Sequence, residues 1–336
     1  MQTQTDVEHA ALVLAPKSLS ELARRAESRQ KLELHTESLA QTSTSDSTQR
    51  AYTSDLKTFA TWCASLGLDR SAWETPETVA LYITHMFESG RKMATIERAM
   101  VSIAQAHRAA NEHEPSPCAD ARVRRVRKNI AKEIGVKPKK KKAVKPDELR
   151  AMVKACPDTL RGKRDRAVLL LGFVGAFRRS ELASLDVSDV AFVSEGAEVT
   201  LRRSKTDQTG KGTVVGIPTG TDLETCPVQA LRAWLEVAHI TDGPLFLTID
   251  RHAHSGARMS GDAVAQVVKS ACIAIGLSPE SYAGHSLRSG LATAAIRAGK
   301  SVAATMRQTR HKSVPIFMGY VQAATVFSDC AASGLL

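Results

Sequence analysis

The sequence predicts a mostly α-helical protein of two domains, with a small antiparallel β-sheet in the second domain. Three observations support this fold class. The chain has 336 residues, whereas one domain usually has about 100–200. Apolar residues recur at spacings of three and four along most of the chain, which is the period of amphipathic helices. Residues 191–218 are instead rich in Val and Thr and broken by glycines, as short antiparallel strands are.

The first half of the chain predicts an N-terminal extension and a small helical domain. Residues 1–45 form the extension, with one expected helix at 19–34 before a polar stretch. Residues 46–134 predict a helical bundle, because proline in a first turn and glycine after a last turn mark helix ends. The helices are expected at about 47–67, 75–90, 93–111 and 118–134.

A basic linker is expected at residues 135–145, because the sequence GVKPKKKKAVK is too self-repelling to fold alone. Residues 121–150 hold thirteen Lys or Arg against three acids. Two interpretations remain open: the run is a solvated linker, or its cations contact phosphates and release counterions. The candidate DNA-binding residues are Arg124, Arg125, Lys139, Lys140, Lys141 and Lys142.

Residues 146–336 predict a second domain that mixes helices with strands. Three short antiparallel strands are expected between 191 and 218. The helices of this domain are expected at 146–156, 162–175, 179–185, 227–238, 261–276, 286–298 and 301–309.

Composition narrows the class of protein. The net charge of +11 attracts polyanions, so nucleic acid is the first partner to consider. No apolar run approaches the ~20 residues of a membrane helix, and the first residues lack the basic start of a signal peptide. We therefore expect an intracellular protein without a membrane partner. The six cysteines form no CxxC pair, which indicates reduced thiols rather than disulfides or a zinc site.

Three short motifs in the second domain carry candidate chemistry. Cleavage of a phosphodiester without a metal needs a nucleophile, fixed positive charge on the phosphate oxygens and a proton donor. No acidic cluster suited to Mg²⁺ stands out in this half, so protein cations would supply the charge. The motifs are GAFRRSEL with Arg178 and Glu181, GHSLRSG with His285 and Arg288, and His311 nine residues before Tyr320.

Each motif has an ordinary structural interpretation when it is taken alone. Arg178 and Glu181 have the spacing of a surface ion pair on a helix. His285 and Arg288, three residues apart, would share one helix face. Tyr320 could be a core aromatic beside Phe317. The three motifs occur together and in this order along the chain, and such a combination is improbable by chance.

Together the motifs resemble the tyrosine recombinase or phage integrase family, in its Cre-like branch. The family pattern Gly-x-x-Arg-x-x-Glu-Leu matches the chain at Gly175, Arg178 and Glu181, and this spacing selects Arg178 over Arg179. The family also has a His-x-x-Arg motif and a His or Trp nine residues before its tyrosine. The run GLATAAIRAGKSVAATM also resembles the Cre-like branch in its Ala-Gly helix ending and its spacing. The resemblance to the family covers about residues 45 to 330.

The resemblance implies a C-shaped, two-domain DNA clamp made of an α-helical core-binding domain and an α+β catalytic domain. Tyr320 would be the nucleophile, and Arg178, Arg288 and His311 would bind the phosphate. His285 would help to accept the tyrosine proton, and Glu181 would support Arg178. Lys205, on a β-hairpin at 201–212, would protonate the leaving oxygen, with Lys211 as the alternative. No metal or cofactor is expected.

The resemblance also implies a site-specific recombinase that acts through a 3′-phosphotyrosine and a Holliday junction. Its partners would be double-stranded DNA with an inverted-repeat site and a homotetramer on two such sites. The protein would be bacterial or phage-encoded, cytoplasmic and associated with the nucleoid. The segment after Tyr320 would either dock on a neighbouring protomer or pack on its own domain. A type IB topoisomerase and a non-catalytic DNA-binding protein are the alternatives.

Two positions depart from the family pattern. Arg310 stands where relatives commonly have glycine before the histidine, and Arg179 is a second arginine after Arg178. They leave open which arginine faces the phosphate and how the turn before His311 is shaped.

Overall fold

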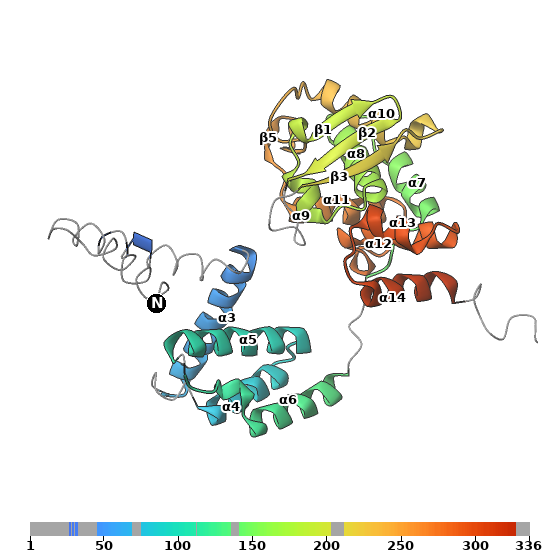
Figure 1. Cartoon of the computed structure of the whole chain (residues 1–336). Coiled ribbons are helices and arrows are strands. Elements are labelled where there is room, and N and C mark those ends of the chain that lie inside the picture. Colours follow the sequence, from blue (N-terminus) through green and yellow to red (C-terminus); the bar gives the residue numbers. More distant parts are fainter. Residues whose placement is uncertain are drawn as a thin grey trace, which may run out of the picture. The chain divides into compact units, whose positions relative to one another are not determined.

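The computed structural model describes residues 46–68, 75–111, 113–135, 141–202 and 212–326, together with 27, 29, 31 and 32. The chain divides into two compact units, Met1–Pro138 and Lys139–Leu336 (Figure 1). The division falls within the basic run 135–145. Of the helix expected at 19–34, the four described residues are helical. Each unit has its own cluster of buried apolar side chains.

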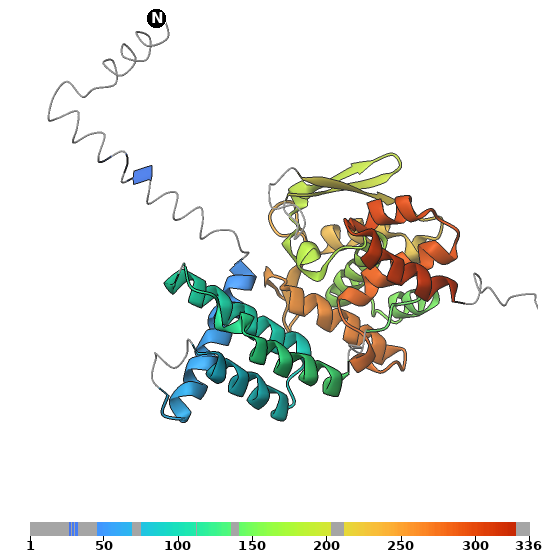
Figure 2. The same cartoon turned by 60° about the horizontal axis from the view of Figure 1, so that its bottom comes forward.

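The first unit is a helical bundle, as the sequence predicts (Figure 2). Thr75 caps the second of its helices by accepting a hydrogen bond from the Thr78 N–H at 3.2 Å. Asp120 caps the last in the same way, so the expected helix at 118–134 is split into a short 3₁₀ turn and a helix that begins at Ala121. The helices are α3 (Asp46–Ser65), α4 (Pro76–Glu88), α5 (Met93–Ala110) and α6 (Ala121–Ile134).

An ion pair with a buried carboxylate links α3 and α5 of this unit. The Arg98 guanidinium on α5 donates from Nε and Nη2 to the Asp55 carboxylate on α3, at 2.8 and 2.9 Å. The Ser102 hydroxyl donates to the same carboxylate at 3.2 Å. The buried Asp55 therefore has the partners that a buried carboxylate needs.

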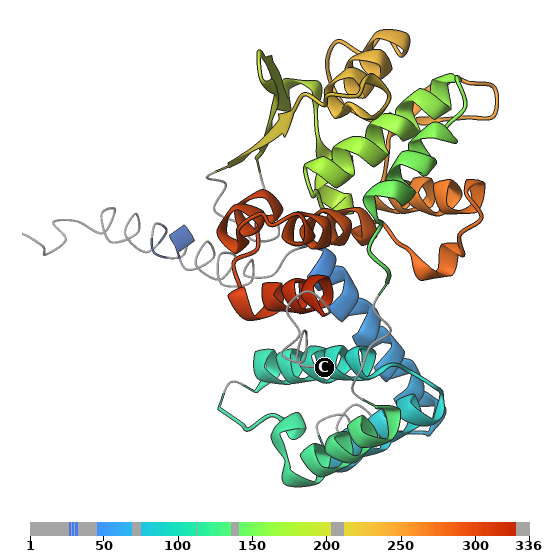
Figure 3. The same ribbon diagram turned by 90° about the vertical axis from the view of Figure 1, so that its right-hand side faces the viewer.

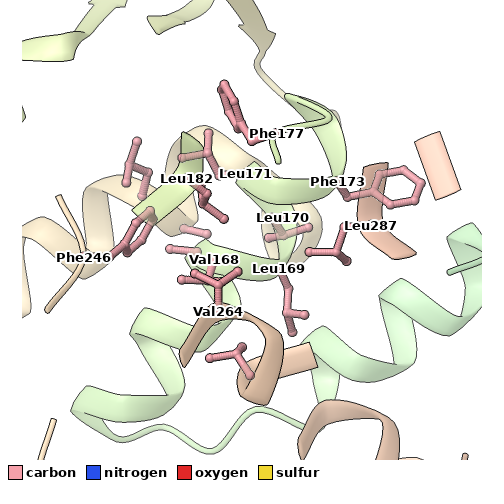
Figure 4. Close-up of a cluster of buried hydrophobic side chains, with 14 of the residues drawn as sticks. Val168, Leu169, Leu170, Leu171, Phe173, Phe177, Leu182, Phe246, Val264 and Leu287 are labelled. Atoms are coloured by element: carbon pink, nitrogen blue, oxygen red, sulfur yellow. The ribbon is translucent and has the colours of Figure 1, made fainter. Parts of the chain in front are cut away.

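The second unit is built around one buried helix. Helix α8 (Leu160–Val174) carries the apolar run Leu169–Leu170–Leu171, and all three side chains are at most 2% exposed. Figure 4 shows them packed with Phe246, Val264 and Leu287 from elsewhere in the unit. The other helices are α7 (Pro146–Lys154), α9 (Arg179–Ser184), α10 (Pro227–Val237), α11 (Gly261–Ala274), α12 (His285–Arg297), α13 (Val302–Thr309) and α14 (Val314–Thr325).

A three-stranded antiparallel sheet lies beside these helices, where the sequence predicts three strands (Figure 3). Its strands are β1 (Val190–Val193), β2 (Gly196–Leu201) and β3 (Thr213–Pro218), with Val199 opposite both Val190 and Val215. A second, two-stranded sheet of β4 (Leu247–Ile249) and β5 (Ser255–Arg258) was not expected. Every residue of β5 is exposed, so its sequence has no alternating apolar pattern to reveal it.

Tyr320 lies within helix α14. The helix begins after Ser313 with Pro315 in its first turn and continues through Tyr320 to Thr325. It packs against α12 of the same unit, and Arg297 Nε of α12 donates to the Ala324 carbonyl at 3.4 Å. The residues directly after Tyr320 thus pack on their own domain, whereas Phe327 and the following residues lie outside the described part of the chain.

Across the described residues, none of the helices combines the length and the apolar character that crossing a membrane requires.

Candidate active site

The first part of the candidate site along the chain is a tight turn at Gly175 and Ala176, directly after α8. Gly175 caps the helix, and a Cβ at this position would lie 2.1 Å from the Phe177 ring, so the close approach requires glycine. Ala176 has φ 45°, in the left-handed region that side chains other than glycine rarely adopt. The carbonyl oxygen of Ala176 accepts hydrogen bonds from two guanidinium groups, those of Arg288 at 2.7 Å and Arg310 at 2.8 Å.

Arg178 follows the turn and is fixed by Glu181. Its backbone N–H donates to Glu181 Oε2 at 2.9 Å, and its guanidinium pairs with Glu181 Oε1. The Glu181 side chain is only 3% exposed, whereas that of Arg178 is 19% exposed. Burial by itself would raise the pKa of Glu181, but the hydrogen bond from the Arg178 backbone N–H and the charges of Arg310 and Arg178 together outweigh it, so the pKa is lowered. A buried carboxylate therefore holds Arg178 while leaving part of its guanidinium accessible.

Arg179 points to a different partner. Its guanidinium pairs with Asp262 on α11, and its side chain is 53% exposed. The charge of Arg178, by contrast, lowers the pKa values of His285 and His311, both of which belong to the site. Of the two arginines that the sequence left as alternatives, the structure thus brings Arg178 to the other candidate residues.

Arg288 is the most deeply buried cation of the described chain. It lies in the first turn of α12, three residues after His285, and is 1% exposed. Burial, and then the charges of Arg178 and Arg310, lower its pKa to about 10, so it remains charged at neutral pH. Within the described residues, its Nε and Nη2 have no hydrogen-bond partner. Two unpaired donors on a buried guanidinium are suited to bind an anion.

Tyr320 lies against both histidines. Its hydroxyl is 3.3 Å from His285 Nε2, and its ring centroid is 5.4 Å from that of His311. Burial raises the pKa of Tyr320, and the charge of Arg288 partly opposes this shift. The tyrosine therefore needs a base to become a nucleophile at neutral pH.

The two histidines are neutral at neutral pH. Burial, followed by the charges of Arg288 and Arg178, lowers the pKa of His285 and lowers that of His311 to about 4. His311 Nδ1 lies 2.7 Å from the Thr309 hydroxyl, which itself donates to the Thr305 carbonyl at the same distance. Nδ1 then donates to Thr309, and Nε2 of His311 has no hydrogen-bond partner among the described residues.

Lys205 and its alternative Lys211 lie outside the described residues. The structure describes the strands on either side: β2 ends at Leu201, opposite Thr213 at the start of β3. Arg202 anchors the end of β2, because its Nε lies 2.6 Å from Asp189 and its Nη2 donates to the Ser188 hydroxyl at 2.7 Å.

The candidate DNA-binding cations lie on α6 and in the basic run. Arg124 and Arg125 are exposed, and neither forms an ion pair with any described residue. Lys141 donates from Nζ to the Glu280 carbonyl, and the backbone N–H of Lys142 donates to Ser281 at 2.7 Å. Lys139 and Lys140 lie outside the described residues.

The sequence did not predict a role for Arg310. Its side chain is only 6% exposed, and it bonds to Glu181 at 3.1 Å as well as to the Ala176 carbonyl. The one signal in the sequence is a large cation directly before His311, where the family commonly has glycine.

The phage integrase family model matches residues 142–325 of the chain. An integrase/recombinase xerD homolog of Selenomonas ruminantium is 34% identical over 311 residues, which cover 91% of this chain and 90% of the relative. The chain therefore belongs to the phage integrase family of tyrosine recombinases, as its motifs indicate.

Solved structures confirm the expected fold. A lambda integrase dimer bound to a core site matches with a TM-score of 0.59 at 18% identity, covering 87% of this chain and 94% of the other. A lambda integrase tetramer bound to a Holliday junction matches with a TM-score of 0.56 at 17% identity, covering 95% and 85%. At such identities the likeness shows the fold alone, which is mostly helical with small antiparallel sheets.

Proposed function

We propose that the protein is a site-specific DNA recombinase that cleaves and rejoins strands through a 3′-phosphotyrosine on Tyr320. The observation that carries this proposal is the buried Arg288 guanidinium, whose Nε and Nη2 have no partner among the described residues. The Tyr320 hydroxyl and His285 Nε2, 3.3 Å apart, belong to the same site. An anion that binds Arg288 would therefore meet a nucleophile and a base.

Tyr320 Oη attacks the scissile phosphorus, and the bond from phosphorus to the 5′ oxygen breaks. His285 Nε2 accepts the tyrosine proton, because its lowered pKa keeps it neutral. Lys205, or Lys211 in its place, donates a proton to the leaving 5′ oxygen. The products are a 3′-phosphotyrosine and a free 5′-hydroxyl. Since the phosphodiester energy is kept in the new bond, ligation needs neither ATP nor a metal.

Arg178 and Arg288 stabilise the negative charge of the transition state. A planar guanidinium can donate two hydrogen bonds to phosphate oxygens, and burial strengthens them. Glu181 holds Arg178 rather than reacting. His311 Nε2 becomes a third donor once the bound phosphate favours protonation of its ring.

The two units would divide the work on DNA. Residues 46–134 serve as the core-binding domain, 135–145 as the linker, and 146–336 as the catalytic domain with its docking tail. Four copies act on two inverted-repeat sites and exchange strands through a Holliday junction. The solved lambda integrase tetramer on a Holliday junction, which shares the fold, supports this assembly. The protein would act in the cytoplasm, at the nucleoid.

The proposal is tested by trapping the covalent intermediate. The protein is incubated in EDTA with duplexes from the DNA that flanks its gene, each nicked just beyond a candidate scissile phosphate. We expect a covalent adduct on a denaturing gel for the wild type and none for Tyr320→Phe. Tyr282→Phe, which changes a buried tyrosine bonded to Glu148 at 3.3 Å, is the matched control and should still trap DNA. No adduct with the wild type, or an adduct with Tyr320→Phe, contradicts the proposal.

A plasmid with two copies of the trapped site separates the alternatives. A recombinase yields excised circles. Relaxation of supercoils without circles would indicate a type IB topoisomerase. In the trapping experiment itself, binding of DNA without any adduct would indicate a non-catalytic DNA-binding protein.

A further inference from the structure

Arg310 occupies a position that is unfavourable for an arginine. It caps α13 with φ 55° and ψ 42°, in the left-handed region, which glycine adopts more readily than any other residue. Its guanidinium is also buried, and burial lowers its pKa. A residue kept in such a place needs compensating interactions.

Those interactions converge on the turn before Arg178. Arg310 Nη1 donates to the carbonyls of Gly175 and Gln308, each at 2.9 Å. Its Nη2 donates to the Ala176 carbonyl at 2.8 Å and to Glu181 Oε2 at 3.1 Å. The four terminal N–H groups of Arg310 are thus all used within the protein.

Two of these acceptors are shared with the proposed phosphate-binding arginines. The Ala176 carbonyl also accepts from Arg288 Nη1 at 2.7 Å. Glu181 also pairs with the Arg178 guanidinium. Among the described residues, Arg288 keeps both Nε and Nη2 without a partner, whereas Arg310 keeps only Nε and has no terminal donor left for a phosphate. Arg288 can therefore donate to a phosphate from a terminal nitrogen, whereas the terminal nitrogens of Arg310 can only hold other parts of the site.

We propose that Arg310 is a positioning residue, which fixes the Gly175–Ala176 turn and Glu181 so that Arg178 and Arg288 face the scissile phosphate. This inference rests on the proposed function. Only a planar fork with several donors can hold acceptors from the turn and a carboxylate together. A lysine keeps the charge but donates from a single nitrogen.

The test compares Arg310→Gly and Arg310→Lys with the wild type. Glycine suits the left-handed backbone, so Arg310→Gly removes the guanidinium without straining the chain. We expect single-turnover cleavage of the nicked duplex to fall roughly 100-fold, the scale of a ~1 Å misplacement. Arg310→Lys should fall by a smaller factor. DNA affinity should remain that of the wild type.

A substrate with an uncharged group in place of the scissile phosphate then distinguishes a positioning role of Arg310 from a general loss of folding or activity. In a methylphosphonate, methyl replaces one non-bridging oxygen and removes the charge that the arginines compensate. If Arg310 acts through Arg178 and Arg288, the ratio of wild-type to Arg310→Gly rates should approach unity for at least one diastereomer.

Arg164→Lys is the matched control. Arg164 is a buried arginine of α8 that pairs with Asp165 at 2.7 Å, about 15 Å along the helix from the turn at 1.5 Å per residue. It should lower the melting temperature and leave the ratio of rates the same on both substrates.

Two results would overturn the inference: cleavage by Arg310→Gly at the wild-type rate, or an equal loss on phosphate and on both methylphosphonates. If the wild type itself forms no adduct, the proposed function fails instead, so the two failures are distinguishable.

Discussion

Two ion pairs between an arginine and a glutamate, one in each unit of the molecule, lie in opposite environments. In the helical unit, Arg122 pairs with Glu77 at the surface, with side chains 60% and 61% exposed. In the catalytic unit, Arg310 pairs with Glu181 at 6% and 3% exposed. The same two residue types thus form a pair at the protein surface and a pair in its interior.

The difference in burial between the two pairs suggests that exposed cations serve DNA binding and buried cations serve the reaction. An exposed pair contributes about 0–1 kcal/mol and is screened by salt, so α6 can offer its cations to DNA at little cost to the fold. A buried charge is expensive unless it is paired. Arg288 stays buried with two unpaired donors, so its environment is best explained by a ligand. We expect mutations in the first unit to change affinity and those in the second to change rate.

The largest effect is expected from Arg288→Lys. An ammonium group cannot present two donors in one plane, and loss of one such donor to a transition state costs about 100- to 1,000-fold in rate. Cleavage of the nicked duplex should fall by that factor, while DNA affinity and its salt dependence stay unchanged. Single-turnover kinetics and fluorescence anisotropy measure the two. Arg179→Lys, at an exposed pair, should keep both. A weaker affinity with unchanged cleavage would reverse the assignment of the two units.

The second effect concerns the exposed face of α6. Changing Arg124 and Arg125 to alanine should flatten the slope of log affinity against log salt by about 0.9 for each phosphate contact that is lost. The cleavage rate at saturating protein should not change. The matched control removes the same charge from α7 by changing Arg150 and Lys154, and its slope should match the wild type. An unchanged slope in the α6 variant would mean that these cations are only solvated.

Helix ends show what the sequence could predict. Thr75 and Pro76 predicted the start of α4 because a cap and a first-turn proline are local signals. Ser313 and Pro315 give the same signal for α14, yet the start of this helix was missed. Helix α14 buries only Phe317 and exposes other apolar residues such as Ile316. Residues 314–321 are almost all apolar, so no alternation with polar residues marks a helical period at the start of α14.

The site shows a similar limit. The resemblance to the family predicted which of the described residues come together, and spacing alone was informative only within a motif: His285 and Arg288 share a turn of α12. The choice of Arg178 over Arg179 had a local signal in the spacing to Glu181, whereas the role of Arg310 depends on acceptors far along the chain. Such tertiary arrangements have no local signal in the sequence.

The smallest effect tests whether burial of the site also affects stability. His311 has a pKa lowered from 6.5 to about 4 in the folded protein, so the unfolded chain binds this proton more tightly. Its contribution is present above pH 6.5 and is lost as the pH falls towards 4. One proton taken up on unfolding changes stability by at most about 1.4 kcal/mol per pH unit, and the half-exposed ring should give less. The melting temperature of the DNA-free protein should fall from pH 7 to 5, and less steeply for His311→Asn. His252→Asn, at an exposed ring of the β4–β5 hairpin, is the control and should follow the wild type. If His311→Asn also follows the wild type, the acid sensitivity arises elsewhere, and burial of the site would have its consequence in the reaction alone.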